Sequence, residues 1–319
     1  VNIEGLDQVG DLMILSSLLG RIDTKNKDYL KLQEAISKIS GGINASSHFY
    51  LDKNEEIKGK LSLSSKSLPE NSLEVTKLMF EILNETKFDN DKRIKELVFQ
   101  NFMGLQQTIV ENGHRFAMLA ASSSHNKLSL MQELSLSSLY KFAPFVSNNE
   151  EMLKAELEKQ VKFFDANKNS ANELMFVSNV LLTKDEVKDI RSLNFKMEGD
   201  SKVELPFKQE FHKIAMPINT QVNFSALSMD APIYDPKESA KYLLLSSLLR
   251  NEYLHKRVRE QGGAYGGGAV YDPFSGTFKM FSYRDPRFID TIQDFEDSLE
   301  WALKGDFSEE ILLEAKPVS

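Results

Sequence analysis

Arg259 and Tyr265 are the residues of this sequence whose types and spacing best suit contact with a substrate. Arginine offers rigid, permanently charged donors, and tyrosine offers a neutral hydroxyl donor. Such a pair suits a peptide carbonyl, or the oxyanion that develops when water attacks that carbonyl. A second interpretation is equally open from the spacing: Arg259 favours a helix C-terminus through the helix dipole, and Tyr265 fills a core.

A glycine-rich run, GGAYGGG at 262–268, surrounds Tyr265. A phosphate-binding loop needs a strand before the glycines and a helix after them, whereas here a helical pattern precedes the run and a strand pattern follows it. Gly262 and Gly263 are typical of a helix C-terminus. Glycines inside a strand mark a bulge or the close approach of another backbone, such as a peptide substrate. We therefore predict Gly263 and Ala264 as substrate-binding positions beside Arg259 and Tyr265.

Zinc chemistry is not supported by the five histidines, which are His48, His114, His125, His212 and His255. None of them begins H-E-x-x-H or H-x-x-E-H, and no two lie three or four residues apart. Because metal sites need clustered ligands, we interpret all five as structural or surface residues and expect no stoichiometric zinc in this chain.

Other nucleophilic chemistry is also not readable in the sequence. The chain has no cysteine, which excludes disulfides, thiolate zinc sites and cysteine nucleophiles. No serine lies in G-x-S-x-G, and we interpret SSSH at 122–125 as a helix terminus.

The elements that must position Arg259 and Tyr265 are a helix expected at 252–260 and a hairpin with strands at 264–271 and 277–283. An earlier segment repeats this order: a helix at 28–39, a Gly-Gly pair, and strands at 43–51 and 56–64. The repetition predicts two related α+β domains, each with an antiparallel-rich sheet packed against helices. Further expected elements are helices at 6–19, 91–111, 115–122 and 288–303, strands at 210–217 and 221–228, and a helix after Asp235-Pro236. A turn-rich stretch at 165–170 places the boundary between domains at 1–165 and 166–319.

Length and composition indicate a folded protein of two domains. The chain has 319 residues, of which 41% are hydrophobic and 27% charged. Its net charge of −8 argues against a nucleic-acid partner. No apolar run approaches the roughly 20 residues that span a bilayer, so we expect no membrane partner. The sequence starts at Val1 without an initiator methionine and ends just after a helical run, so we interpret it as a fragment of a longer polypeptide.

Two motifs resemble the presequence protease family, the branch of the insulinase-like zinc peptidases that includes falcilysin. They are VREQGGAYGGG at 258–268 and SYRDP at 282–286. The stretches GGINASSH at 41–48 and HRFAMLAASS at 114–123 resemble segments of the same family. The resemblance therefore extends over most of the chain.

This resemblance implies four α+β domains of the metallopeptidase LuxS-like type, arranged in two halves around a closed chamber. The first half of such an enzyme carries H-x-x-E-H and holds zinc, and the second half contributes an Arg and a Tyr that map onto Arg259 and Tyr265. The family's substrates are unfolded peptides. By this resemblance, 1–165 is third-domain-like and 166–319 is fourth-domain-like, with further C-terminal helices missing after Lys316.

The zinc ligands would then lie in an N-terminal half of the same polypeptide, which becomes the chain's partner, and the chain by itself would be inactive. A non-catalytic, peptidase-like binding or scaffold subunit is the alternative, because the zinc motif is absent. The expected compartment is the cytoplasm for a bacterial protein and an organellar lumen for a eukaryotic one.

Overall fold

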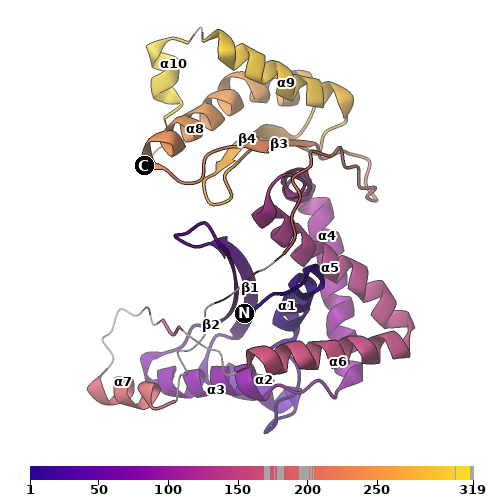
Figure 1. Ribbon diagram of the computed structural model, residues 1–319, viewed down its shortest axis with the longest axis vertical. Helices are drawn as coiled ribbons and strands as arrows, with labels where there is room; N and C mark the ends of the chain where they lie inside the picture. Colours follow the sequence, from indigo (N-terminus) through magenta and orange to yellow (C-terminus); the bar gives the residue numbers. More distant parts are fainter. Residues whose placement is uncertain are drawn as a thin grey trace. The chain divides into compact units, whose positions relative to one another are not determined.

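The computed structural model describes residues 1–168, 173–175, 177, 183–193, 201, 203, 205–305 and 307–316, with the backbone alone at 139–148 and 191. These residues form two compact units (Figure 1). Unit 1 comprises Val1–Gly104 and Leu134–Leu205, and unit 2 comprises Leu105–Glu133 and Pro206–Ser319. Each unit combines helices with a small antiparallel sheet, which confirms the predicted α+β class.

The two units are not divided at the predicted boundary of 165 and 166. The long helices α4 (Asp91–Ser123) and α5 (Lys127–Asn148) each contribute residues to both units. Of the turn-rich stretch at 165–170, residues 169 and 170 lie outside the described part of the chain. The assignment of 1–165 and 166–319 to third-domain-like and fourth-domain-like regions stays a prediction.

Unit 1 is built around a two-stranded hairpin with helices packed against it. Besides parts of α4 and α5, its elements are α1 (Leu6–Leu18), α2 (Tyr29–Ile39), β1 (Ile43–Leu51), β2 (Ile57–Ser65), η1 (Pro69–Asn71), α3 (Ser72–Glu85), α6 (Glu150–Asn167) and α7 (Lys184–Arg191). Strands β1 and β2 pair antiparallel, with Ile43 opposite Ser65. Gly42 has a φ of 120° between α2 and β1, a conformation that glycine adopts without a steric cost.

Asp11 is a buried carboxylic acid at the contact between α1 and α6. Its Oδ1 lies 2.8 Å from Lys159 Nζ, and its side chain is only 3% exposed. Burial raises the pKa of Asp11 to about 6, although the hydrogen bond and charge of Lys159 act in the opposite direction. The folded protein therefore binds the proton of Asp11 more tightly than the unfolded chain does.

We expect Asp11 to make unit 1 less stable as the pH rises from about 4 to above 6. The folded pKa is raised, so the unfolded state releases this proton first and gains free energy from ionisation over that range. The Asp11→Asn variant stays neutral, and we expect it to be more stable than the parent at pH 7 by about 2 kcal/mol. Urea unfolding at pH 4 and pH 7 tests this, with exposed Asp7→Asn as the control. An equal difference at both pH values would contradict it.

Unit 2 contains a three-stranded sheet with the order β3-β5-β4, all antiparallel. Besides parts of α4 and α5, its elements are β3 (Ala226–Asp230), α8 (Pro236–Leu248), the π-helix η2 (Leu249–Gln261), β4 (Gly266–Asp272), β5 (Thr277–Tyr283), α9 (Ile289–Lys304) and α10 (Glu309–Glu314). Asp235 caps α8 by accepting from the N–H groups of Lys237 and Glu238, with Pro236 at the first helical position as predicted.

The core of unit 2 lies between the sheet and the helices α8, η2 and α9, and Figure 1 shows α8 and α9 on one side of the strands. The buried side chains of this core are Leu249, Leu254, Val258, Ala264, Ala269, Tyr271, Phe278, Met280 and Phe295. The opposite face of β5 carries Phe281 and Tyr283, which contact His114 of α4. Both ends of the turn between η2 and β4 are therefore fixed by packed elements.

The strand predicted at 210–217 is wrong. These residues are described, and they form no strand. Phe211, Ile214 and Met216 are all more than 45% exposed, so the apolar spacing that suggested a strand does not face a core. The strand predicted at 221–228 begins later, as β3.

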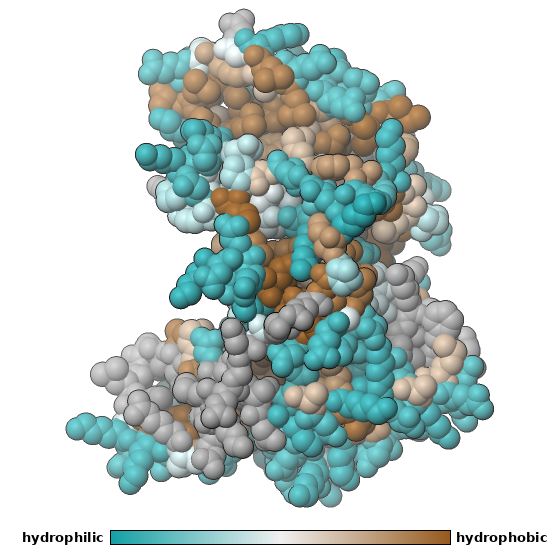
Figure 2. Space-filling view, in the orientation of Figure 1, coloured by the Kyte–Doolittle hydropathy of each residue, from teal (hydrophilic) through white to brown (hydrophobic). Residues whose placement is uncertain are grey.

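Much of the exposed apolar surface consists of single side chains between polar ones, as Figure 2 shows. Exposed aromatic side chains of unit 2 include Phe211, Tyr234, Tyr265, Phe274 and Phe288. In the described parts of the chain, no helix combines the length and the apolar character needed to cross a membrane.

Candidate functional site

The turn between η2 and β4 has a geometry set by its two glycines. Gly263 N donates to Arg259 O at 3.0 Å and Ala264 N donates to Val258 O at 3.1 Å, which closes the end of the helix. Gly263 has a φ of 80°, in the left-handed region that costs other residues energy. The interpretation of Gly262 and Gly263 as a helix C-terminus is thus confirmed.

Arg287 fastens this turn to α9. A Cβ added at Gly262 would lie 2.0 Å from Arg287 Nη2, so the guanidinium passes directly over the glycine. Arg287 Nη2 also donates to Asp294 Oδ2 at 2.8 Å, and Arg287 N donates to the buried Asp285 at 2.9 Å. The turn that joins Arg259 to Tyr265 is therefore held from outside as well as by its own hydrogen bonds.

Tyr265 points to solvent. Its side chain is 71% exposed, which rules out the interpretation that it fills the core. Arg259 is also exposed, and its Nη1 lies 3.1 Å from His255 Nε2. Among the described residues, no contact joins the Arg259 and Tyr265 side chains. Both are accessible to a ligand, and their predicted roles as catalytic residues stay predictions.

The predicted substrate-binding positions differ in what they present. Gly263 is exposed, whereas Ala264 is 4% exposed and its methyl group lies in the core of unit 2. Any contact of Ala264 with a substrate would have to come from its backbone. The roles of Gly263 and Ala264 stay predictions.

The glycines at 266–268 have an explanation within the protein. A Cβ at Gly267 would lie 2.8 Å from Val258 Cγ1, and a Cβ at Gly268 would lie 3.1 Å from Arg250 Nε. Both neighbours belong to η2, which packs closely on β4. For Gly267 and Gly268, the approaching group that the sequence suggested is therefore the preceding helix, and a peptide substrate is not needed to explain them.

Tyr283 is the platform on which Tyr265 rests, a role that sequence reasoning missed. The Tyr265 and Tyr283 rings meet edge to face with centroids 5.7 Å apart. The other neighbours of Tyr283 are His114 at 4.9 Å and Phe224 at 5.7 Å. These edge-to-face and tilted contacts favour a fixed ring orientation. The resemblance to SYRDP was the signal that could have drawn attention to Tyr283.

His114 supports Tyr283 as a neutral group. Burial, and secondarily the charge of Arg115, lower the pKa of the His114 imidazole below its ordinary value. Its Nδ1 is buried and has no hydrogen-bond partner among the described residues. Helix α4 loses helical geometry at Asn112, just before this histidine. A Cβ at Gly113 would overlap the Phe224 ring, so the glycine allows the close approach.

None of the histidines lies in a metal-binding cluster within the described residues, where no three His, Cys, Asp or Glu side chains come together in the way a metal ion requires. His48 contacts Ser46, His212 contacts Glu210, and His255 contacts Arg259 and Glu260.

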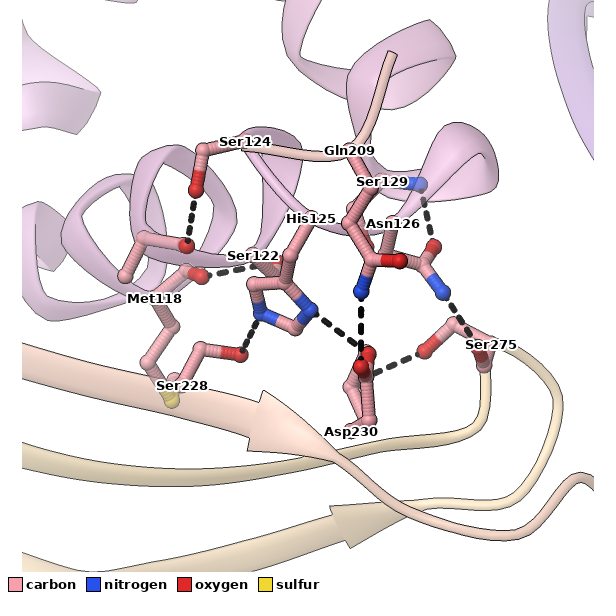
Figure 3. A network of polar contacts seen from close by, with 12 residues as sticks. Met118, Ser122, Ser124, His125, Asn126, Ser129, Gln209, Ser228, Asp230 and Ser275 are labelled. Atoms are coloured by element: carbon pink, nitrogen blue, oxygen red, sulfur yellow. Dashed lines mark hydrogen bonds and ion pairs between the residues drawn. The ribbon is translucent and has the colours of Figure 1, made fainter. Parts of the chain in front are cut away.

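His125 forms a connection that the sequence did not predict (Figure 3). Its Nδ1 lies 2.8 Å from Asp230 Oδ1 and its Nε2 lies 2.9 Å from Ser228 Oγ. This is the order of groups in a Ser-His-Asp hydrolase. However, the imidazole is 0% exposed and the Phe211 ring stacks on it at 4.9 Å. A substrate cannot reach the imidazole in this arrangement.

The His125 network attaches the turn between α4 and α5 to the sheet. Asn126 Nδ2 donates to Ser275 O at 2.7 Å, and Gln209 Nε2 donates to Asp230 Oδ2 at 2.8 Å (Figure 3). We therefore assign His125 a structural role, in agreement with its interpretation from the sequence, but with partners that the sequence did not identify.

We expect His125→Leu to lower the free energy of unfolding by about 2 kcal/mol, because it removes hydrogen bonds to Asp230 and Ser228 while keeping apolar contact with Phe211. Urea unfolding measures this loss. The exposed His212→Leu serves as the control and is expected to change stability by less than about 0.5 kcal/mol. Equal effects of the two substitutions would contradict the assignment.

Two family models match the chain. Residues 5–142 match the model of the domain associated with peptidases of family M-16, subfamily C, and residues 213–315 match the model described as "PreP C-terminal domain". The second match contains the η2–β4 turn with Arg259 and Tyr265.

Curated relatives match nearly the whole chain. It is 30% identical over 334 residues to the mitochondrial presequence protease of Candida albicans, covering 95% of this chain and 32% of that protein. It is 26% identical over 323 residues to the mitochondrial presequence protease of Yarrowia lipolytica, covering 96% of this chain and 32% of that protein. The chain thus spans about a third of the length of these relatives.

Solved structures share the fold. A conserved protein from Enterococcus faecalis matches with a TM-score of 0.59 and 15% identity, covering 98% of this chain and 76% of that one. A protease from Helicobacter pylori matches with a TM-score of 0.58 and 11% identity, covering 96% of this chain and 73% of that one.

Proposed function

Because this chain belongs to the presequence protease family of peptidases, as a C-terminal part of such a protein, we propose that it holds unfolded peptide substrates for a zinc endopeptidase. The presentation of Tyr265 carries this proposal. An exposed tyrosine hydroxyl stands on a turn that is fixed by two glycines, Arg287 and the Tyr283 ring.

Tyr265 and Arg259 would divide the work on a bound peptide. The Tyr265 hydroxyl would donate a hydrogen bond to the scissile carbonyl oxygen, where negative charge develops during hydrolysis. Arg259 would bind a neighbouring peptide carbonyl through its guanidinium. Since the turn is fixed before the substrate arrives, little free energy is spent on ordering these groups.

Zinc does not fit the residues of this chain. The described residues hold no cluster of three potential ligands, so a catalytic zinc would have to be held elsewhere in the same polypeptide. The curated relatives are about three times as long as this chain, which supports an additional zinc-bearing half as its partner. As those relatives are named as mitochondrial proteins, we propose an organellar lumen if this protein is eukaryotic, and the cytoplasm if it is bacterial.

Peptide hydrolysis by the intact polypeptide tests this function. We expect cleavage of an unfolded peptide that a zinc chelator abolishes, no cleavage of a folded protein, and no cleavage by the 319-residue chain alone. Peptide binding without hydrolysis by the intact polypeptide would instead support the alternative, a non-catalytic binding or scaffold subunit, which the lack of a ligand cluster in the described residues favours.

A further inference from the structure

Arg284 has an unusual backbone. Its φ is 49°, and Glu55 with a φ of 61° is the other residue besides glycine with a positive φ in the described parts of the chain. A left-handed conformation costs an L-residue with a Cβ of this size roughly 1 kcal/mol, and glycine or asparagine would occupy it more easily. Such strain often marks a position where the side chain has a task.

The strained backbone places Arg284 next to Tyr265. Arg284 O accepts a hydrogen bond from Tyr265 N at 3.3 Å. Arg284 Cζ lies 5.4 Å from the centroid of the Tyr283 ring, and the Tyr265 ring lies 5.7 Å from the same ring. The exposed guanidinium and the exposed hydroxyl are thus carried by one aromatic platform.

The guanidinium of Arg284 is available to a ligand. Arg257 and Arg287, which lie near the same turn, both approach Asp294, at 4.0 and 2.8 Å. In contrast, Arg284 has no carboxylate partner among the described residues, and the residue is exposed. An unpaired arginine offers two parallel N–H donors that match the two oxygens of a carboxylate.

We propose that Arg284 binds a carboxylate of the peptide substrate and thereby gives the site a preference for peptides that carry a carboxylate close to the bond held by Tyr265. This inference rests on the proposed peptide-binding function. The carboxylate comes from either an acidic side chain or the C-terminus of the peptide. Tyr283 acts as a positioning residue that presents Arg284 and Tyr265 together.

Four matched peptides distinguish these sources in the intact polypeptide. They share one unfolded sequence and differ only in a Glu or Gln at one position and in a free or amidated C-terminus. We expect kcat/KM to be about 10-fold higher for the Glu peptide, or for the free C-terminus, than for its neutral counterpart, the scale of one charge-assisted hydrogen-bonded pair. Whichever pair shows the preference identifies the source.

Arg284→Gly separates recognition from structure. The glycine relieves the left-handed strain, so we expect a Tm equal to or above that of the parent together with loss of the 10-fold preference. Arg284→Lys keeps the charge but loses the planar pair of donors, and we expect it to keep only part of the preference. Glu55→Gly, at the other strained position, is the matched control and should leave the preference unchanged.

Equal kcat/KM for all four peptides in the parent protein would overturn the role of Arg284 and leave the proposed function standing. A preference that survives in Arg284→Gly would overturn it as well. If the intact polypeptide neither binds nor cleaves any of the four peptides, the proposed function fails, and the inference about Arg284 fails with it.

Discussion

Replacing Tyr265 with phenylalanine is expected to lower kcat/KM for peptide hydrolysis by about 100-fold in the intact polypeptide, with most of the loss in kcat. The substitution removes a single hydroxyl that points to solvent, since the side chain is 71% exposed. The phenyl ring keeps its edge-to-face contact with Tyr283 and the backbone bond to Arg284. The loss would therefore report on the hydroxyl and not on the fold.

Steady-state kinetics with one unfolded peptide, combined with thermal unfolding, measure both effects of Tyr265→Phe. The Tm should equal that of the parent. Tyr234→Phe is the matched control, because Tyr234 is 65% exposed in the same unit and lies outside the η2–β4 turn. An unchanged kcat/KM for Tyr265→Phe would sink the proposed role of its hydroxyl and leave only a contact surface.

Elements whose signals are local could be predicted from the sequence. Strand β1 has the predicted bounds, and β2 is displaced by one residue, since alternation and the flanking turns define this hairpin. Asp235 and Pro236 identify the start of α8 because capping and proline geometry act within three residues. The helix–Gly-Gly–hairpin order occurs in both units, with positive φ at Gly42 and Gly263.

Features that depend on distant partners could not be predicted. His125 meets Ser228 and Asp230, which lie 103 and 105 residues away in the sequence. The sequence correctly indicated a helix terminus there, but nothing local identifies those two partners. The segment at 210–217 failed for a related reason, because apolar spacing suggests a strand without supplying a neighbouring strand to pair with.

The candidate site was predicted in part for the same reasons. Residue types and the resemblance singled out Arg259 and Tyr265, and the structure confirms that both side chains are exposed on a fixed turn. The Tyr283 platform depends on α4, which contributes His114, and on the segment before β3, which contributes Phe224. These aromatic contacts come from three separate regions of the chain, so periodicity within any one region does not reveal them.

Gly262→Ala is expected to lower the free energy of unfolding by roughly 2–3 kcal/mol, the scale of overpacking in a closely packed region. The new Cβ would lie 2.0 Å from Arg287 Nη2 and 2.5 Å from Val258 O. The carbonyl belongs to the backbone of η2 and cannot rotate away. Moving Arg287 would break its 2.8 Å contact with Asp294. Because the same shift displaces the turn, peptide hydrolysis should fall together with stability.

Gly104→Ala is the matched control for this substitution, since Gly104 lies within α4 and a Cβ there meets no atom within 4 Å. Alanine is a better helix former than glycine, so this variant should be as stable as the parent or more stable by about 0.5–1 kcal/mol. Urea unfolding of both variants compares a glycine required by close packing with one that is not. If Gly262→Ala proved as stable as Gly104→Ala, Arg287 and the η2 backbone would have to yield without cost, and the turn could not be the fixed support that Arg259 and Tyr265 need to act on a peptide.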